Sequence, residues 1–267
     1  MNFGVSSMVL PLKKVALLRP GASLLEADIN KWHYSNIFNP DKVQGIYNNF
    51  VNLLTDEGVE IFWIEENTNI ADAIFTYDAS MMTKSGAILM SPGKELRKGE
   101  QNIHRNFYKH NNIPIIGEIT GKATAEAGDT LWLDDNSLIV GKGFRTNQEG
   151  VNQIKEFMKP VKVDVFQFDI PVYMGTVACL HLMSLISLVD HRKALVYSPL
   201  LPVSLFKLLE EKGFTLINAP EDEFLSSQTL STNILTISPR KCIMMDGFPK
   251  TRESLENFGI SVKVFNA

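Results

Sequence analysis

Residues 126–150 read EAGDTLWLDDNSLIVGKGFRTNQEG, and this stretch combines candidate site residues with a pattern of elements that recurs along the chain. Two carboxylates, Glu126 and Asp129, precede an apolar strand, a polar turn reverses the chain, and a second apolar strand follows. Arg145 then stands directly before a stretch that begins a helix. Carboxylates and a guanidinium that converge on one pocket suit a small ligand that carries both a positive group and a carboxylate.

The second strand of this stretch belongs to a series of five short apolar strands, each of which ends at a Gly or Pro turn. They are Val15–Gly21, Ala87–Gly93, Leu138–Gly143, Ala194–Pro199 and Cys242–Gly247. Each is followed by a helical pattern and then by a further strand, and the helices are expected at 40–57, 99–111, 146–159, 202–212 and 249–258. The third helix is expected to open with a capping box of Thr146 and Glu149.

Four of these strands also have a partner strand ahead of them, joined by a short polar turn, at 74–83, 130–133, 181–189 and 234–237. Each unit is therefore strand, strand, helix, strand. Small units of this kind bury both faces only when several lie side by side in a ring, which also removes exposed sheet edges. The sequence predicts an α/β fold, a five-bladed α/β propeller forming one domain over residues 1–267, with units of about 1–66, 67–120, 121–170, 171–220 and 221–267.

A ring of this kind places equivalent positions of the partner strands around one central axis. Counting nine residues back from each recurring strand gives polar residues in four units, and the fourth unit carries a histidine near the start of its longer strand. These residues are Ser6, Asp78, Asp129, His181 and Asn233. The spacing predicts that they share one central site.

Composition excludes several classes of partner. The net charge is −4 and the basic residues are scattered among acidic ones, so no nucleic-acid face is expected. Residues 170–189 lack charged side chains and are about long enough to span a bilayer, but Pro171, Gly175 and His181 interrupt them. A buried segment is therefore expected, with no membrane partner. Because residues 1–10 lack a secretory pattern and two cysteines are too few for a disulfide framework, a cytoplasmic protein is expected.

No cofactor or metal is predicted. His104, His110 and His191 do not make metal-ligand spacings with one another or with a cysteine. The chain has no glycine-rich nucleotide loop. Cys179 and Cys242 stand in apolar surroundings that are typical of core residues.

Five motifs, taken in order, carry a family resemblance over nearly the whole chain: Asp72–Asp78 (DAIFTYD), Gly93–Glu100 (GKELRKGE), Glu126–Asp129 (EAGD), Arg145–Asn147 (RTN) and Leu180–Leu182 (LHL). The chain resembles the guanidino-group-modifying enzymes of the pentein fold, most closely the dimethylarginine dimethylaminohydrolase and arginine deiminase branch. The resemblance implies a hydrolase that acts on the C–N bond of an arginine-like guanidino compound through a covalent cysteine thiouronium intermediate.

The resemblance also implies roles for individual residues. His181 would be the acid and base, Glu126 its orienting carboxylate, and Asp78 a clamp on the guanidinium. Four further residues would bind the substrate: Asp72, Arg97, Asp129 and Arg145. Arg97 and Arg145 are expected to hold the substrate carboxylate, and Asp72 to contact the substrate elsewhere. The expected partner is a small guanidino substrate, and a homodimer is an open alternative.

Two features depart from the family pattern. The family nucleophile is a cysteine in a Gly-rich loop after a final strand like residues 262–267, and neither Cys179 nor Cys242 occupies that loop. An active enzyme would therefore carry its cysteine beyond Ala267. Tyr77 stands where relatives of the dimethylarginine type often have an acid. Two alternatives stay open: a catalytically inactive pentein that binds arginine or a relative, and an amidinotransferase.

Overall fold

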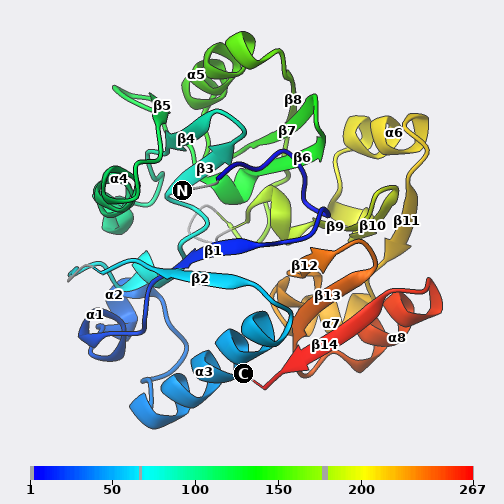
Figure 1. Ribbon diagram of the computed structural model, residues 1–267. Coiled ribbons are helices and arrows are strands. Elements are labelled where there is room, and N and C mark those ends of the chain that lie inside the picture. The colour runs from blue at the N-terminus through cyan, green and yellow to red at the C-terminus, as the bar shows by residue number, and fades with distance from the viewer. Residues whose placement is uncertain (1–2, 66–67, 176–179, 267) are drawn as a thin grey trace.

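Five small β-sheets surround a central axis in the computed structural model, which describes residues 3–65, 68–175 and 180–266 (Figure 1). Four blades hold an antiparallel strand, a middle strand and a parallel strand, whereas blade 1 pairs β1 only with β2, in parallel, within the described residues. The strands of blades 1 to 3 are β1 (Lys14–Leu17) and β2 (Glu60–Trp63); β3 (Ser80–Thr83), β4 (Gly86–Leu89) and β5 (Ile115–Glu118); and β6 (Thr130–Asp134), β7 (Ser137–Lys142) and β8 (Asp164–Asp169). Those of blades 4 and 5 are β9 (Ile186–Asp190), β10 (Lys193–Val196) and β11 (Thr215–Asn218); and β12 (Leu235–Ser238), β13 (Lys241–Met245) and β14 (Ser261–Phe265).

A helix joins the middle strand of each blade to its parallel strand and lies on the outside of the ring (Figure 1). These helices are α3 (Pro40–Asp56), α4 (Glu100–His110), α5 (Gln148–Met158), α6 (Val203–Glu211) and α8 (Pro249–Asn257). Shorter helices are α1 (Ala22–Leu25), α2 (Ile29–Trp32) and α7 (Glu221–Ser226). The predicted five-bladed α/β propeller is confirmed, and the five expected helices are present to within a few residues of their predicted ends.

The start of α3 shows why the sequence places these helices well. The Asn39 side chain accepts a hydrogen bond from the Lys42 backbone N–H, and Pro40 occupies the first helical turn, where its missing N–H costs nothing. The predicted cap of α5 was wrong, however. Asn147 caps this helix by accepting from the Gly150 N–H, and the Thr146 hydroxyl instead donates to the Asp129 carboxylate at 2.7 Å.

Two predicted partner strands are shorter than expected because turns replace their first halves. The stretch 74–83 is a strand only over Ser80–Thr83, and 181–189 begins with a 3₁₀ turn, η5 (Leu182–Ser184), before β9. His181 therefore lies at the start of a turn and not within a strand. The physical reason is that the Leu182 N–H donates to the Asp129 carboxylate at 3.0 Å and so takes no part in a strand ladder.

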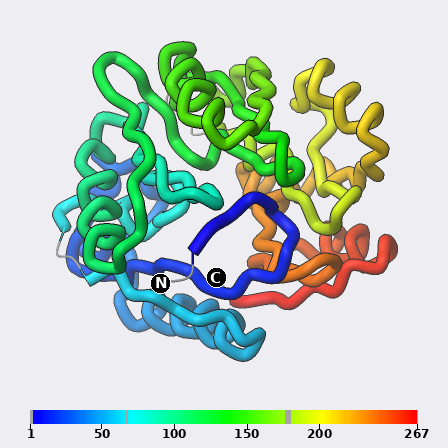
Figure 2. Tube along the Cα trace, turned by 45° about the horizontal axis from the view of Figure 1, so that its top comes forward, coloured from blue at the N-terminus to red at the C-terminus, as the bar shows by residue number. Residues whose placement is uncertain are grey.

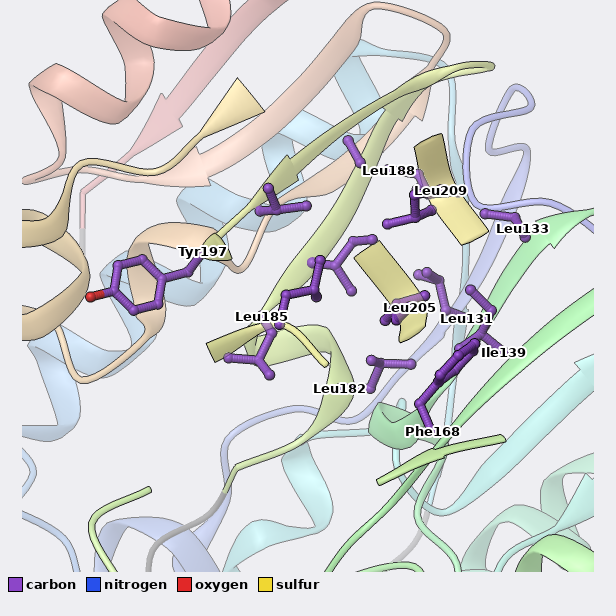
Figure 3. Close-up of a cluster of buried hydrophobic side chains, with 14 of the residues drawn as sticks. Leu131, Leu133, Ile139, Phe168, Leu182, Leu185, Leu188, Tyr197, Leu205 and Leu209 are labelled. Carbon is purple, nitrogen blue, oxygen red and sulfur yellow. The ribbon is translucent and has the colours of Figure 1, made fainter. Parts of the chain in front are cut away.

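Apolar side chains fill the spaces between neighbouring blades. The cluster between blades 3 and 4 joins β6, β7 and β9 to helix α6 and includes Leu182 and Leu185 from the turn after His181 (Figure 3). Its ten labelled members are Leu131, Leu133, Ile139, Phe168, Leu182, Leu185, Leu188, Tyr197, Leu205 and Leu209. Because close-packed cores resist displacement, this cluster holds the turn that carries His181 against blade 3.

Blades 1 and 5 lie next to each other and close the ring (Figure 2). The Leu12 N–H donates to the Ile237 carbonyl at 2.7 Å, and Glu57, after α3, pairs with Lys241 at 2.7 Å and Lys263 at 2.5 Å. Within the described ranges, no helix is long and apolar enough to cross a bilayer.

Candidate active site

Three turns at the centre of the ring bring together side chains that are far apart in sequence. Asp78 lies just before β3, Glu126 just before the 3₁₀ turn η3 (Ala127–Asp129), and His181 just before η5. One ligand atom of each side chain lies within 4.8 Å of those of the other two. Two of the residues that were expected on spacing alone, Asp78 and His181, are therefore neighbours at one site.

Glu126 is the most heavily contacted member of this group and is fully buried. His181 Nε2 lies 2.8 Å from Glu126 Oε2, Arg145 Nη1 donates to both carboxylate oxygens at 3.1 Å, and the Gly93 N–H donates to Oε1 at 2.9 Å. Burial opposes ionisation of Glu126, but the His181 hydrogen bond and the nearby charges lower its pKa to about 2. Glu126 is thus an ionised hydrogen-bond acceptor beside the His181 ring.

Arg97 connects Asp78 to a second buried carboxylate. Its Nη1 donates to Asp78 Oδ2 at 2.6 Å and its Nε donates to Glu100 Oε1 at 2.8 Å, while Nη1 lies 3.9 Å from Glu126 Oε2. Burial would lower the pKa of Arg97, but the Asp78 and Glu100 carboxylates raise it, so the guanidinium stays charged. At Glu100, the effect of burial on the pKa is larger than the opposing effect of the Arg97 charge. The pKa of that carboxyl is therefore raised to about 7.

Gly128 is a site residue that the sequence analysis did not single out. Its N–H donates to Asp78 Oδ1 at 3.0 Å. A Cβ at this position would lie 2.7 Å from Asp78 Oδ1 and 2.8 Å from His181 Nδ1, closer than non-bonded atoms approach. Only glycine lets the two side chains pack against this backbone. The third position of the EAGD motif was the available signal.

Asp129 is also fully buried, at the end of the 3₁₀ turn η3 that follows Glu126. Its two oxygens accept from Thr146 Oγ1 and from the Leu182 N–H, so a direct contact with substrate would require these hydrogen bonds to rearrange. Burial raises the pKa of Asp129 to about 6, although its hydrogen bonds and the nearby His181 oppose this shift.

Because its pKa is raised, the Asp129 carboxyl is expected to stabilise the folded protein more at acidic pH than at neutral pH. Asp129→Asn removes this dependence on pH. A carboxyl whose folded pKa of about 6 exceeds its unfolded value of 3.8 stabilises fully below pH 3.8 and loses that contribution as pH rises through 6. We expect the free energy of unfolding of the native protein, relative to Asp129→Asn, to fall by about 3 kcal/mol over this window. Urea denaturation from pH 4 to 7 checks this, and a constant difference would contradict it.

The predicted substrate contact Asp72 lies in a separate network. Lys94 Nζ lies 2.7 Å from Asp72 Oδ2, and the Tyr34 hydroxyl donates to Asp72 Oδ1 at 2.5 Å. Lys94 also contacts the first group, because its N–H donates to Glu126 Oε1 at 3.3 Å. Asp72 is therefore linked to the central group through a single residue.

A cavity of about 220 Å³ opens beside Arg145. Its walls are mainly apolar and include Phe144, Pro171, Val172, Tyr173 and Leu180. Arg145 brings a cation to the cavity wall, and a second cation, Lys142, pairs with Asp169 at 2.7 Å. A small molecule with one anionic end fits such walls.

Three further residues from the sequence analysis lie apart from this group or outside the described residues. Ser6, expected on the central axis, donates instead to Asp135 Oδ1 at 2.7 Å in the turn between β6 and β7. Cys242 is buried in β13, where burial raises the pKa of its thiol to about 12. Cys179 lies outside the described residues. Neither the buried position of Cys242 nor the raised pKa of its thiol suits a nucleophile.

Asp78, Glu126 and His181 are also the described residues that come near a metal-ligand arrangement. The donor set argues against a cation there, because Arg97 pairs with Asp78, and Arg145 pairs with Glu126. A divalent ion would meet two guanidinium charges at its own ligands. That the site works without a metal stays a prediction.

A family model described as arginine deiminase matches residues 62–205, more than half of the chain. Curated relatives include two N(G),N(G)-dimethylarginine dimethylaminohydrolases. That of Pseudomonas aeruginosa is 24% identical over 234 residues, which are 85% of this chain and 84% of the relative. That of Streptomyces coelicolor is 23% identical over 256 residues, which are 94% of this chain and 88% of the relative.

Solved structures show the same fold at lower sequence identity. A mutant of the Pseudomonas aeruginosa dimethylarginine dimethylaminohydrolase in complex with citrulline has a TM-score of 0.78 at 22% identity and covers 96% of this chain and 93% of its own. An amidinotransferase from Microseira wollei has a TM-score of 0.77 at 14% identity and covers 100% and 92%. By its family model, the chain belongs to the arginine deiminase family, and the solved structures agree with it in fold.

Proposed function

We propose that this protein hydrolyses a C–N bond of an arginine-like guanidino compound, as a dimethylargininase or an arginine deiminase does. The observation that carries the proposal is the meeting of Asp78, Glu126 and His181 within 4.8 Å at the centre of the ring. A guanidinium is planar, and its N–H groups can donate hydrogen bonds to two carboxylates at once. The substrate group would take over contacts that Arg97 and Arg145 make in the free protein.

Each side chain has a defined part in the proposed reaction. A cysteine thiolate attacks the guanidinium carbon, which Asp78 fixes, and forms a C–S bond. His181, held by Glu126, gives a proton to the departing amine as the C–N bond breaks, leaving a thiouronium. His181 then takes a proton from an attacking water, and the thiolate leaves as the urea-type product forms. The proton given in the first step is thus recovered in the second.

The nucleophile is the group of this reaction that the described residues do not supply. Blades 2 to 5 carry the antiparallel strands β3, β6, β9 and β12 beside their middle strands, and within the described residues β1 has no such partner. The family resemblance implies a cysteine in a Gly-rich loop after a strand like β14, and we propose that such a loop brings it to the site. Two of the three catalytic groups enter the ring just before an antiparallel strand, Asp78 ahead of β3 and His181 ahead of β9.

The test is product release by protein made from the natural gene, with its intact mass measured. Arginine, methylated arginines and agmatine are supplied, and ureido product and amine are quantified. We expect turnover of at least one compound, and the intact mass compares the active protein with the 29.9 kDa of this sequence. Saturable binding without turnover, at a mass of 29.9 kDa, would contradict the hydrolase and support the binding alternative.

Amidino transfer is the second candidate, and the likeness to the Microseira wollei amidinotransferase over the whole chain favours it. The two reactions share the thiouronium and differ in whether water or an amine attacks it. Supplying glycine or another primary amine with the guanidino donor separates them. A new guanidino compound in place of the ureido product would identify a transferase.

Arg145→Ala is expected to weaken binding of substrates that carry a carboxylate. A hydrogen bond between charged groups contributes about 1.5 to 3 kcal/mol, so affinity for arginine should fall roughly 10- to 150-fold. Affinity for agmatine, which lacks the carboxylate, should change much less. Isothermal titration of both ligands checks this. Arg105→Ala is the matched control, because Arg105 on α4 pairs with Glu118 on β5. This change should leave both affinities unchanged.

A further inference from the structure

Lys94 is held by several contacts at once between the proposed reaction site and Asp72. Its backbone N–H donates to Glu126 Oε1 at 3.3 Å, and its Nζ lies 2.7 Å from Asp72 Oδ2. The same Nζ donates to the Trp32 carbonyl at 3.4 Å and lies 5.1 Å from the centre of the Trp32 ring, within the range of a cation–π contact. The contacts with Asp72 and Trp32 therefore fix the position of the Lys94 ammonium.

Asp72, for its part, has both oxygens occupied by donors from its own chain. Lys94 takes Oδ2, and the Tyr34 hydroxyl donates to Oδ1 at 2.5 Å. Burial and the Asp72 carboxylate both raise the pKa of Tyr34, so its hydroxyl remains a donor. Asp72 is nearly buried and Lys94 is mostly so, which limits screening of this ion pair by solvent.

We propose that Lys94 is a specificity-determining residue that favours ω-guanidino carboxylates without an α-ammonium group over arginine. This inference rests on the proposed function, in which the guanidinium lies at Asp78 and Glu126. An α-ammonium that reaches Asp72 meets a cation already in place, and must displace it or lie beside a like charge. A substrate without that ammonium meets no such cost.

Arg145 supports the same substrate class. Arg145 lines the cavity and offers a cation to a carboxylate. Among the described residues of the site, Asp72 pairs with Lys94, Asp78 with Arg97, and Glu126 with Arg145. A substrate therefore meets charge pairs at each of these positions, and at Asp72 the chain already supplies the cation that an α-ammonium would otherwise bring.

The experiment compares three ligands that differ by one group each. L-Arginine carries ammonium and carboxylate, 5-guanidinopentanoate carries only the carboxylate, and agmatine carries only the ammonium. Titration calorimetry gives affinities, and turnover gives kcat/KM. We expect the native protein to prefer 5-guanidinopentanoate to arginine. Lys94→Met keeps the side-chain length without the charge and should raise affinity for arginine and agmatine, relative to 5-guanidinopentanoate, by about 10- to 100-fold.

Two variants show that the effect belongs to the ion pair. Asp72→Asn in the Lys94→Met background should cancel the gain, because the carboxylate that the ammonium would contact is gone. Lys98→Met, an exposed lysine paired with Glu95 in the same segment, should leave the order of ligands unchanged. Lys94→Gln is a second neutral variant, and thermal melting of every variant verifies folding.

The outcomes separate this inference from the proposed function. A native protein that prefers arginine, with no change of the ratio in Lys94→Met or Lys94→Gln, would overturn the role of Lys94 and leave the hydrolase standing. Preference for 5-guanidinopentanoate in binding, without turnover, would support Lys94 and contradict the hydrolase. Absence of binding for all three ligands would overturn both.

Discussion

Replacing His181 by alanine should lower release of amine and ureido product by about 10²- to 10⁴-fold, which is the usual contribution of a positioned acid and base. His181 is the one histidine at the central site, among the described residues, whose ring contacts a site carboxylate, with Nε2 2.8 Å from Glu126 Oε2. In the proposed reaction His181 protonates the departing amine, and the alanine variant lacks that acid. Product release under saturating substrate measures the effect.

A matched control keeps the His181 result specific. His110→Ala removes an exposed histidine at the end of α4 and should leave turnover and melting temperature unchanged. Binding of a non-reacting ligand such as citrulline should be retained in His181→Ala, because the carboxylates remain. Full turnover in His181→Ala would remove this residue from the mechanism. Loss of citrulline binding together with loss of turnover would indicate a misfolded site.

Glu126→Gln should damage both stability and activity more than any other single neutralisation at the site. The change removes the buried carboxylate with which Arg145 pairs, and breaking a buried pair in this way costs about 3 to 5 kcal/mol. It also removes the group that orients His181. Chemical denaturation at pH 7 measures the first effect and product release the second.

The stability lost in Glu126→Gln should depend on pH in a defined direction. The folded pKa of about 2 lies below the unfolded value of 4.5, so the contribution of Glu126 is complete above pH 4.5 and is lost as pH falls through 2. The gap between the native protein and Glu126→Gln should therefore narrow below pH 4.5. Glu118→Gln, at the partly exposed pair with Arg105, is the control and should cost less than about 1 kcal/mol. An equal cost at both positions would contradict the buried network.

Local elements were predictable because their causes lie within a few residues of one another. Helix α3 follows from Asn39, Pro40 and a single apolar face, and its observed bounds are within one residue of those expected. The antiparallel strands were predicted in four units and not in the first, and the same four blades carry them in the structure. Local patterns sufficed for these elements.

The candidate site was predictable only in part. Spacing placed Asp78 and His181 on a common axis, and they are neighbours, but the same count included Ser6, which donates to Asp135 instead. The role of Thr146 was misjudged for a related reason. Its hydroxyl fits a helix cap by sequence, yet Asp129, 17 residues earlier in the chain, lies close enough to take it.

The repeated unit, the helices and the identity of the charged residues could be read from local sequence patterns, because periodicity and turn chemistry act between near neighbours. Which charges pair depends on how the blades pack in three dimensions. His181 and Glu126 are 55 residues apart, and Lys94 reaches Asp72 across 22. Such pairings depend on distances between blades and on burial, which set the strength of each interaction and the pKa of each group. For that reason the arrangement around Glu126, and the ion pair that defines the expected substrate, emerged only from the folded ring.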